Sequence, residues 1–187
     1  IMLSEPQESS GIKVLGELET LFAELQLDKA GNATEFTRRM DELRVEHDHD
    51  RLLAEAMRDA GNVILPVVLA GGVDDEINPE KEKLIRSHSM NLLAKPGYGV
   101  THVTKGYLPI GQFMKAAMAV GHLNPPLDDD GKIRRDTLFY EYKGFNIPSF
   151  SLATAAAYHG IDTKKKPAKL GAGYAGLSGL DVPIDLS

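Results

Sequence analysis

The segment of residues 120–158 limits the possible fold more than any other part of this chain, because it specifies four elements in succession. Residues 120–124 are apolar enough for a short buried strand, and Pro125-Pro126 end that strand because proline donates no hydrogen bond to a neighbouring strand. Residues 128–131, three aspartates and a glycine, have the composition of a turn. The first half of the segment therefore predicts a strand followed by a turn.

The second half of the segment predicts another strand and then a helix. Residues 137–142 alternate between two faces, as a strand does, and Lys143-Gly144 can turn the chain after them. Ser149 is suited to cap a helix of small residues over 152–158, which Gly160 closes. Strands that alternate with helices are typical of an α/β domain.

The rest of the chain supports the same class. Ile12, Leu15 and Leu18 recur at helical spacing, and the sequence after residue 62 contains a short apolar run suited to a buried strand. The elements that we expect are helices over residues 11–27, from Thr34, from Asp50 to Gly61, over 80–93 and over 109–120, and a strand over 63–69. These patterns predict a single α/β domain over residues 1–187, with a central sheet and helices on its faces.

Three motifs resemble one family of bacterial proteins. The order Gly121-His122-Leu123-Asn124, aspartate turn, Arg134-Arg135 and Pro148-Ser149 before a small-residue helix looks like the second type of CHASE domain, a family of extracellular sensory domains attached to cyclases and histidine kinases. Residues 50–66, ending in Asn-Val-Ile-Leu-Pro, are similar to the helix and strand of such domains, and Leu3-Ser4-Glu5-Pro6 is similar to the end of an early strand. The resemblance reaches across roughly the first 160 residues.

The resemblance implies a function as well as a fold. Such a domain is the extracytoplasmic part, periplasmic or on the cell surface, of a membrane-anchored signalling protein, and it relays a signal to a cytoplasmic cyclase, histidine kinase or other kinase. We therefore expect a chain without catalytic activity or a cofactor, with an unknown small-molecule ligand and with membrane spans outside these residues. A ligand would act by shifting a dimer between two arrangements.

The chain departs from the family pattern near its start. The strand and helix that usually precede the Ser-Glu-Pro stretch are absent, so we expect either that the sequence begins inside the domain or that this part has been lost or is supplied by a partner chain. Residues 9–48 form a longer helical insertion than the family pattern implies. The amphipathic helices of residues 11–48 are the surface through which we expect a homodimer to form.

Five polar residues in the segment are candidates for contact with a ligand. His122 and Asn124 alternate along one strand, and the resemblance places them beside a strand that carries Arg134 and Arg135. An arginine at this point can bind an anion, and Asp130 lies in the adjoining turn. The favoured alternative is structural: a buried His and Asn bonded to the backbone, and an internal ion pair.

Composition and spacing exclude several other functions. The net charge of −6, from 21 basic and 27 acidic residues, disfavours nucleic acid as a partner. The chain contains no cysteine, which excludes disulfides and thiolate chemistry. His47-Asp48-His49-Asp50 is better explained as a solvated helix junction than as a metal site, and the twelfth position from Asp128 is Phe139, where a calcium loop needs glutamate. We therefore expect no metal.

Three alternatives stay open. The glycine spacing of residues 171–176 is that of a dinucleotide-binding turn, although a flexible or hairpin loop is favoured because a lysine linker precedes it and Leu180-Asp181-Val182-Pro183 follows it. A small-molecule hydrolase would need His122, Asp130 and Arg134 to converge in a pocket. An interaction scaffold without a ligand would show a large apolar patch instead.

Overall fold

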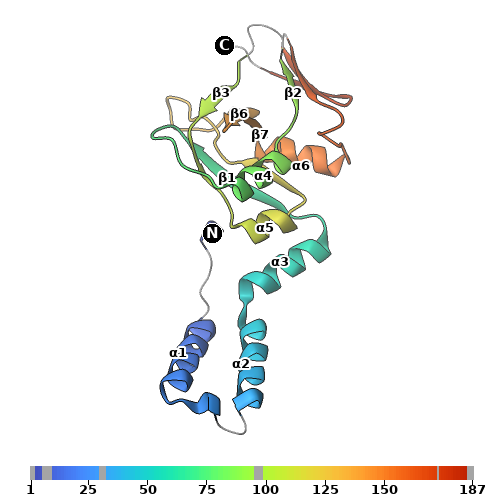
Figure 1. Ribbon diagram of the computed structural model, residues 1–187. Helices are drawn as coiled ribbons and strands as arrows, with labels where there is room; N and C mark the ends of the chain where they lie inside the picture. The colour runs from blue at the N-terminus through green and yellow to red at the C-terminus, as the bar shows by residue number, and fades with distance from the viewer. Residues whose placement is uncertain (1–2, 6–9, 30–32, 95–98, 172, 185–187) are drawn as a thin grey trace.

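The computed structural model describes residues 3–5, 10–29, 33–94, 99–171 and 173–184. The chain forms a body of helices and strands from which a two-helix arm projects (Figure 1). The arm consists of α1 (Ser10–Glu24), a short 3-10 turn η1 (Leu27–Lys29) and α2 (Ala33–His47), and α3 (His49–Ala60) joins it to the body. The α/β class and the helical insertion near the N-terminus are both confirmed.

Local side-chain chemistry sets the ends of the helices. The Asp48 carboxylate accepts a hydrogen bond of 2.9 Å from the Arg51 N–H and so caps α3, which begins at His49, one residue before the predicted start at Asp50. Gly61, with φ of 65°, ends α3 as predicted. In α2 the helix already includes Ala33, so Thr34 lies inside it rather than at its cap.

Two predicted helices are too long. Helix α4 (Pro79–His88) begins after the Asn78 cap and stops at His88 instead of residue 93, and β2 (Leu92–Ala94) follows it. Helix α5 (Gly111–Ala116) occupies only the middle of the predicted range 109–120. In both cases apolar residues beyond the end of the helix belong to strands of the body. The pairing of these strands with distant segments therefore outweighs the helical pattern of the local sequence.

The centre of the body is a sheet in two parts. Strand β1 (Ile64–Ala70) pairs in parallel with β5 (Ala119–His122) and antiparallel with β4 (Lys105–Tyr107). The hairpin of β6 (Phe139–Tyr142) and β7 (Phe145–Pro148) pairs with β3 (Thr101–Val103), which is parallel to β6. A parallel bridge between His122 and Ser149 joins the two parts. The predicted strands over 63–69, 120–124 and 137–142 are therefore confirmed, each with slightly different ends.

A tight turn connects β6 to β7 at the position predicted from the sequence. Lys143 and Gly144 have φ of 53° and 78°, the pair of positive values that a type I′ hairpin turn requires. Ser149 then caps α6 (Phe150–Tyr158) by accepting a hydrogen bond from the Leu152 N–H, which confirms the predicted start of this helix.

A four-stranded sheet at the C-terminal end was not predicted. It consists of β10 (Leu180–Pro183), β9 (Tyr174–Leu177), β8 (Ala168–Gly171) and β2 in that order. The glycine-rich residues 171–176 form the β8–β9 hairpin, with Ala172 outside the described residues. No helix follows this turn in the described part of the chain, so the favoured hairpin interpretation is confirmed and the dinucleotide interpretation is wrong.

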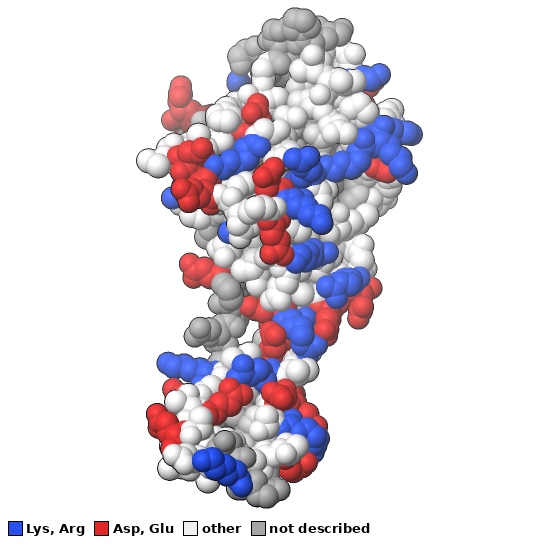
Figure 2. Space-filling model, viewed as in Figure 1, with Lys and Arg blue, Asp and Glu red and all other residues white. Residues whose placement is uncertain are grey.

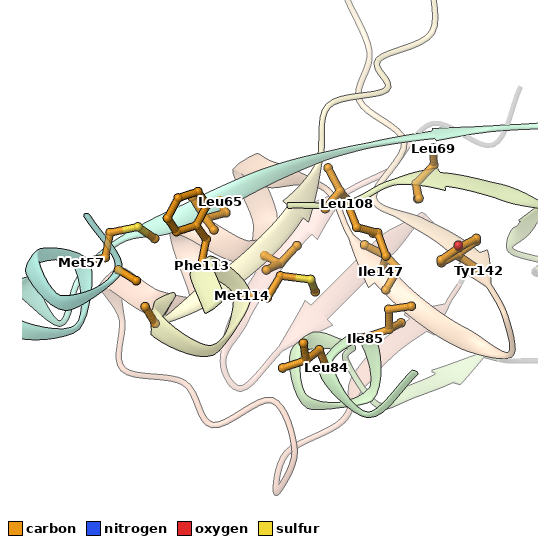
Figure 3. Packing of buried hydrophobic residues seen from close by; sticks show 14 of the residues in the cluster. Met57, Leu65, Leu69, Leu84, Ile85, Leu108, Phe113, Met114, Tyr142 and Ile147 are labelled. Carbon is orange, nitrogen blue, oxygen red and sulfur yellow. The ribbon is translucent and has the colours of Figure 1, made fainter. Parts of the chain in front are cut away.

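The main hydrophobic core lies between the sheet and the helices α3, α4 and α5. Leu65, Leu69 and Phe113 are among its buried residues, and Met57 of α3 packs into the same cluster (Figure 3). A second cluster joins α6 to the C-terminal sheet through Leu152, Ala156, Ala168 and Leu177, among others. Helix α6 also packs along β5, so the segment of residues 120–158 lies between the two cores.

Candidate functional site

The segment singled out in the sequence surrounds the C-terminal end of the parallel strands β1 and β5, which is where α/β sheets commonly bind ligands. Gly121 brings α6 close to this end. A Cβ atom at Gly121 would lie 2.5 Å from Phe150 Cα and 2.9 Å from the Ser149 carbonyl oxygen. Only a glycine permits this approach of backbone to backbone.

Asn124 extends the pairing of the two strands. Its side-chain oxygen accepts a hydrogen bond of 2.8 Å from the Leu69 N–H, and its side-chain nitrogen donates one of 2.6 Å to the Leu69 carbonyl. The side-chain amide of Asn124 therefore pairs with β1 as a backbone peptide group would. Its oxygen and its nitrogen both have a hydrogen-bond partner within the chain.

His122 is buried beside the start of α6, with only 1% of its surface exposed. Its ring meets the Tyr140 ring edge to face, with centroids 4.8 Å apart. Neither ring nitrogen has a hydrogen-bond partner in the described part of the chain. Burial lowers the pKa of His122 to about 4, although the Asp136 carboxylate and the Thr137 backbone favour the protonated ring. His122 is therefore neutral near pH 7.

Two serines and an aspartate lie next to this histidine in the fold. The Ser149 and Ser151 hydroxyl oxygens are 2.9 Å apart, and the Ser151 hydroxyl donates to the Asp136 carboxylate. The bridge between strands brings His122 beside Ser149, a neighbour that the sequence did not reveal. However, neither ring nitrogen bonds to a hydroxyl of the described residues, so the hydrogen-bond chain of a catalytic triad is not formed.

Asp130 and Arg134 pair with each other in the loop before β6. Arg134 binds the Asp130 carboxylate with both terminal nitrogens, at 2.8 and 2.7 Å, and donates to Asp128 at 2.9 Å. These bonds hold the pKa of the Asp130 carboxyl below its usual value and raise that of Arg134. The expected strand through Arg134 and Arg135 is wrong, because residues 132–138 have no regular structure and the ion pair holds them as a loop.

The five candidate residues thus lie in two groups. His122 and Asn124 belong to the end of β5, whereas Asp130, Arg134 and Arg135 belong to the exposed loop. Among the described residues, no hydrogen bond links Asp130 or Arg134 to His122. The convergence that a hydrolase would need is not present in this arrangement.

A groove lies beside β5, between the end of α4 and α6. It has a volume of about 220 Å³, and we refer to it as the α4–α6 groove. Its lining includes His88 from the end of α4, three alanines of α6, Asp162 and Lys164. The small side chains Ala153, Ala156 and Ala157 create the space, because any larger residue would fill it.

Two basic side chains at the groove are bonded to backbone carbonyls. The His88 Nε2–H donates to the Met114 carbonyl at 2.8 Å, which leaves Nδ1 as an acceptor on the neutral ring. Lys164 donates to the Arg86 carbonyl at 2.6 Å and also to the carbonyl and hydroxyl of Ser89, at the C-terminus of α4. Burial lowers the pKa of both side chains.

The histidine and acidic side chains of the described residues do not gather into a metal site. No three His, Asp or Glu side chains among them lie close enough together to hold a metal ion. At the expected helix junction of residues 47–50, Asp48 acts as a helix cap. None of the helices in the described ranges is long and apolar enough to cross a membrane.

Comparison with protein-family models matches residues 2–186 to the CHASE2 domain. The chain belongs to the CHASE2 family. CHASE2 domains are extracellular sensory domains of signalling proteins, so the resemblance seen in the sequence is confirmed. No match was found among curated proteins or among solved structures.

In this CHASE2 domain, most of the quoted motif residues hold the fold together. Gly121 allows the start of α6 to approach β5 closely, Asn124 bonds to the Leu69 backbone, and Ser149 caps α6. The residues of the α4–α6 groove were not identified from the sequence, because they come from three separate segments and Lys164 resembled part of a solvated linker. The run of alanines in α6 was the one local signal that could have indicated a groove.

Proposed function

We propose that this chain is the extracytoplasmic sensory part of a membrane-anchored protein, and that it relays a ligand signal to a cytoplasmic cyclase or kinase module. The family match over residues 2–186 carries the proposal. Membrane spans and the output module would lie outside residues 1–187.

The α4–α6 groove is our proposed ligand site. Its alanine floor accepts the apolar part of a small molecule, and His88 offers an acceptor for a hydrogen-bond donor on the ligand. The volume of about 220 Å³ limits the ligand to the size of an amino acid or a small organic acid. Contact of a ligand with His122, Asn124, Asp130, Arg134 and Arg135 stays a separate prediction.

A continuous series of packed helices leads from this groove to the arm. Helix α4 forms one wall of the groove and packs on α5, and α5 packs on α3, which continues into α2. A ligand that binds one arrangement of α4 more tightly than another would shift the population of arm positions by its difference in affinity.

A thermal-shift screen tests the ligand site. The chain would be screened against amino acids, small organic and inorganic anions, nucleotides and divalent metals, because binding to the native state raises the melting temperature in a dose-dependent way. We expect one chemical class to raise the melting temperature, and Ala157→Leu to abolish this shift by filling the groove. Ala155→Leu, on the same helix but outside the groove lining, should retain it.

An interaction scaffold is the second candidate function. The large apolar side chains exposed along the arm favour it, since such surfaces mark protein contacts. Absence of any shift in the screen would favour the scaffold over ligand sensing, and a shift that survives Ala157→Leu would place the ligand outside the groove.

A further inference from the structure

Helix α1 carries two apolar stripes, of which one packs on α2. Leu15 of α1 and Met40 of α2 are the buried hydrophobic residues of the arm among those described. The Phe22 and Phe36 rings stack between the two helices, with centroids 4.4 Å apart and planes 8° from parallel. The Arg44 guanidinium and the Glu19 carboxylate add an ion pair between α2 and α1. The side of α1 that faces α2 is therefore covered by that helix.

The second stripe has no partner within the described chain. It consists of Val14, Leu18 and Leu21 of α1 and of Leu25 just after the end of α1, which together we call the outer stripe, and their surfaces are 52%, 43%, 48% and 59% exposed. Successive members are four, three and four residues apart. An ordinary surface helix has charged residues on the side that faces water, so four aliphatic residues in line there are unusual.

The spacing of the outer stripe indicates what covers it. Alternation of three and four residues is the repeat of a left-handed coiled coil, in which each apolar side chain inserts between residues of a second helix. Figure 1 shows the arm extending away from the body, so another arm can lie along it. The arm also has too few buried side chains to form a core of its own.

We propose that the outer stripe packs against the outer stripe of a second copy of this chain, so that two arms form a four-helix bundle. This surface is inferred from the arm alone and does not depend on the proposed ligand or output. The proposal restricts the dimer surface, which was expected over residues 11–48, to one side of α1.

The charges beside the stripe favour parallel arms. Glu17 and Glu24 flank the outer stripe on the same side, and the charge on neither is balanced by an ion pair in the described chain. In an antiparallel pair, Glu17 of each copy would lie near Glu24 of the other, and like charges would repel. A parallel pair avoids this contact and places both bodies at the same end of the bundle.

The affinity should be modest. The outer stripe spans only about two heptads, so we expect the interface to lie at or below the lower end of the range of roughly 1,200–2,000 Å² found for specific protein pairs. On the face of the arm seen in Figure 2, acidic and basic side chains are interspersed, so a single sign of charge does not dominate that face. Dimers should therefore form at protein concentrations on the order of 0.1 mM.

Sedimentation equilibrium from about 10 µM to about 1 mM tests the proposal. We expect the wild-type chain to dimerise and Leu18→Glu to raise the dissociation constant at least tenfold. Leu52→Glu is the matched control, since Leu52 is also a helical leucine that is 43% exposed, but it lies on α3 outside the stripe. A wild-type monomer throughout, or a dimer that Leu18→Glu leaves intact, would overturn the proposal. Circular dichroism would check that both variants keep their helices.

Cysteine cross-linking gives a second, independent measurement, because the chain has no cysteine of its own. In a parallel pair Leu18 faces its counterpart, so Leu18→Cys should form a covalent dimer on mild oxidation and Leu52→Cys should not. Preferential cross-linking in a mixture of Leu18→Cys and Leu21→Cys chains would instead show antiparallel arms and overturn the parallel arrangement.

Discussion

At the scale of single residues, His122 is the clearest case of a polar side chain that contributes to the fold through the packing of its ring rather than through hydrogen bonds. The ring packs edge to face on Tyr140 and is 1% exposed, yet neither nitrogen has a hydrogen-bond partner in the described chain. A buried polar atom without a partner costs about 1–3 kcal/mol. An apolar ring of similar shape should therefore be tolerated at this position.

We predict that His122→Phe makes the protein less sensitive to acid. Burial lowers the pKa of His122 to about 4 from 6.5, so the unfolded state binds more protons between these values and the free energy of unfolding falls as the pH falls through that window. His122→Phe should remove on the order of 2 kcal/mol of this loss between about pH 7 and about pH 4.5. Urea denaturation at the two pH values would measure it.

Another histidine provides the control for this experiment. His159 is exposed, and His159→Gln is the matched substitution of a histidine that is not buried in the fold. If the unfolding free energy of His122→Phe falls with pH as steeply as that of the wild type, burial of His122 is not the cause. A loss of more than about 2 kcal/mol at pH 7 would show that the ring nitrogens have a partner, such as a bound water.

The sequence predicted which polar residues matter better than it predicted how they act. Ser149 as a helix cap could be read locally, because its partner Leu152 is three residues away. The partner of Asn124 is Leu69, which is 55 residues away in sequence, and only the fold brings them together. Arg134 binds Asp130 four residues before it, but a strand pattern concealed that pairing.

At the scale of elements, Lys164 completes the end of a helix that is distant in sequence. Its ammonium group donates to the carbonyls of Arg86 and Ser89, where α4 ends and its dipole is negative. A lysine within a charged run is normally solvated, so this role could not be inferred from residues 164–166 alone.

We predict that Lys164→Met lowers the free energy of unfolding by about 1–2 kcal/mol, because the last carbonyls of α4 lose their donor while the apolar part of the side chain is kept. Hydrogen exchange should accelerate at Ser89, whose N–H bonds to the Ile85 carbonyl. Lys166→Met, at an exposed neighbour without an ion pair in the described chain, should change the unfolding free energy by less than about 0.5 kcal/mol. Equal effects of the two substitutions would contradict the cap.

The elements divide clearly into those that the sequence predicts and those that it does not. Helices α1 and α3 and strand β1 have strong apolar periodicity or clear end signals, and each was predicted. Strands β2, β8, β9 and β10 are three or four residues long and have no such periodicity, and two of them contain glycine. Their stability comes from pairing between distant segments, such as Leu92 with Ala168, which no local pattern reports.

At the scale of the whole molecule, the arm and the body differ in how much they bury. The body contains both hydrophobic clusters, whereas among the described residues of α1 and α2 only Leu15 and Met40 are buried hydrophobic residues. Packing of α3 on α5 connects the two parts, with Met57 in the core beside Phe113 (Figure 3). The arm is therefore the part whose structure a partner or a signal can change at least cost.

We predict that the amides of α1 and α2 exchange with solvent far faster than those of β1 and β5 in dilute protein, because regions with few buried contacts open locally at low free energy. Protection of α1 and α2 should rise at least tenfold when the concentration is raised to about 1 mM, since association stabilises the folded arm by mass action. Hydrogen exchange followed by mass spectrometry would measure both.

Leu18→Glu should abolish this dependence on concentration while leaving the protection of β1 and β5 unchanged, because it alters only the outer stripe. Slow exchange throughout α1 and α2 at about 1 µM would show instead that the arm is stable without a partner. In that case a second copy could not order the arm, and a signal would have to move it as a rigid lever through α3.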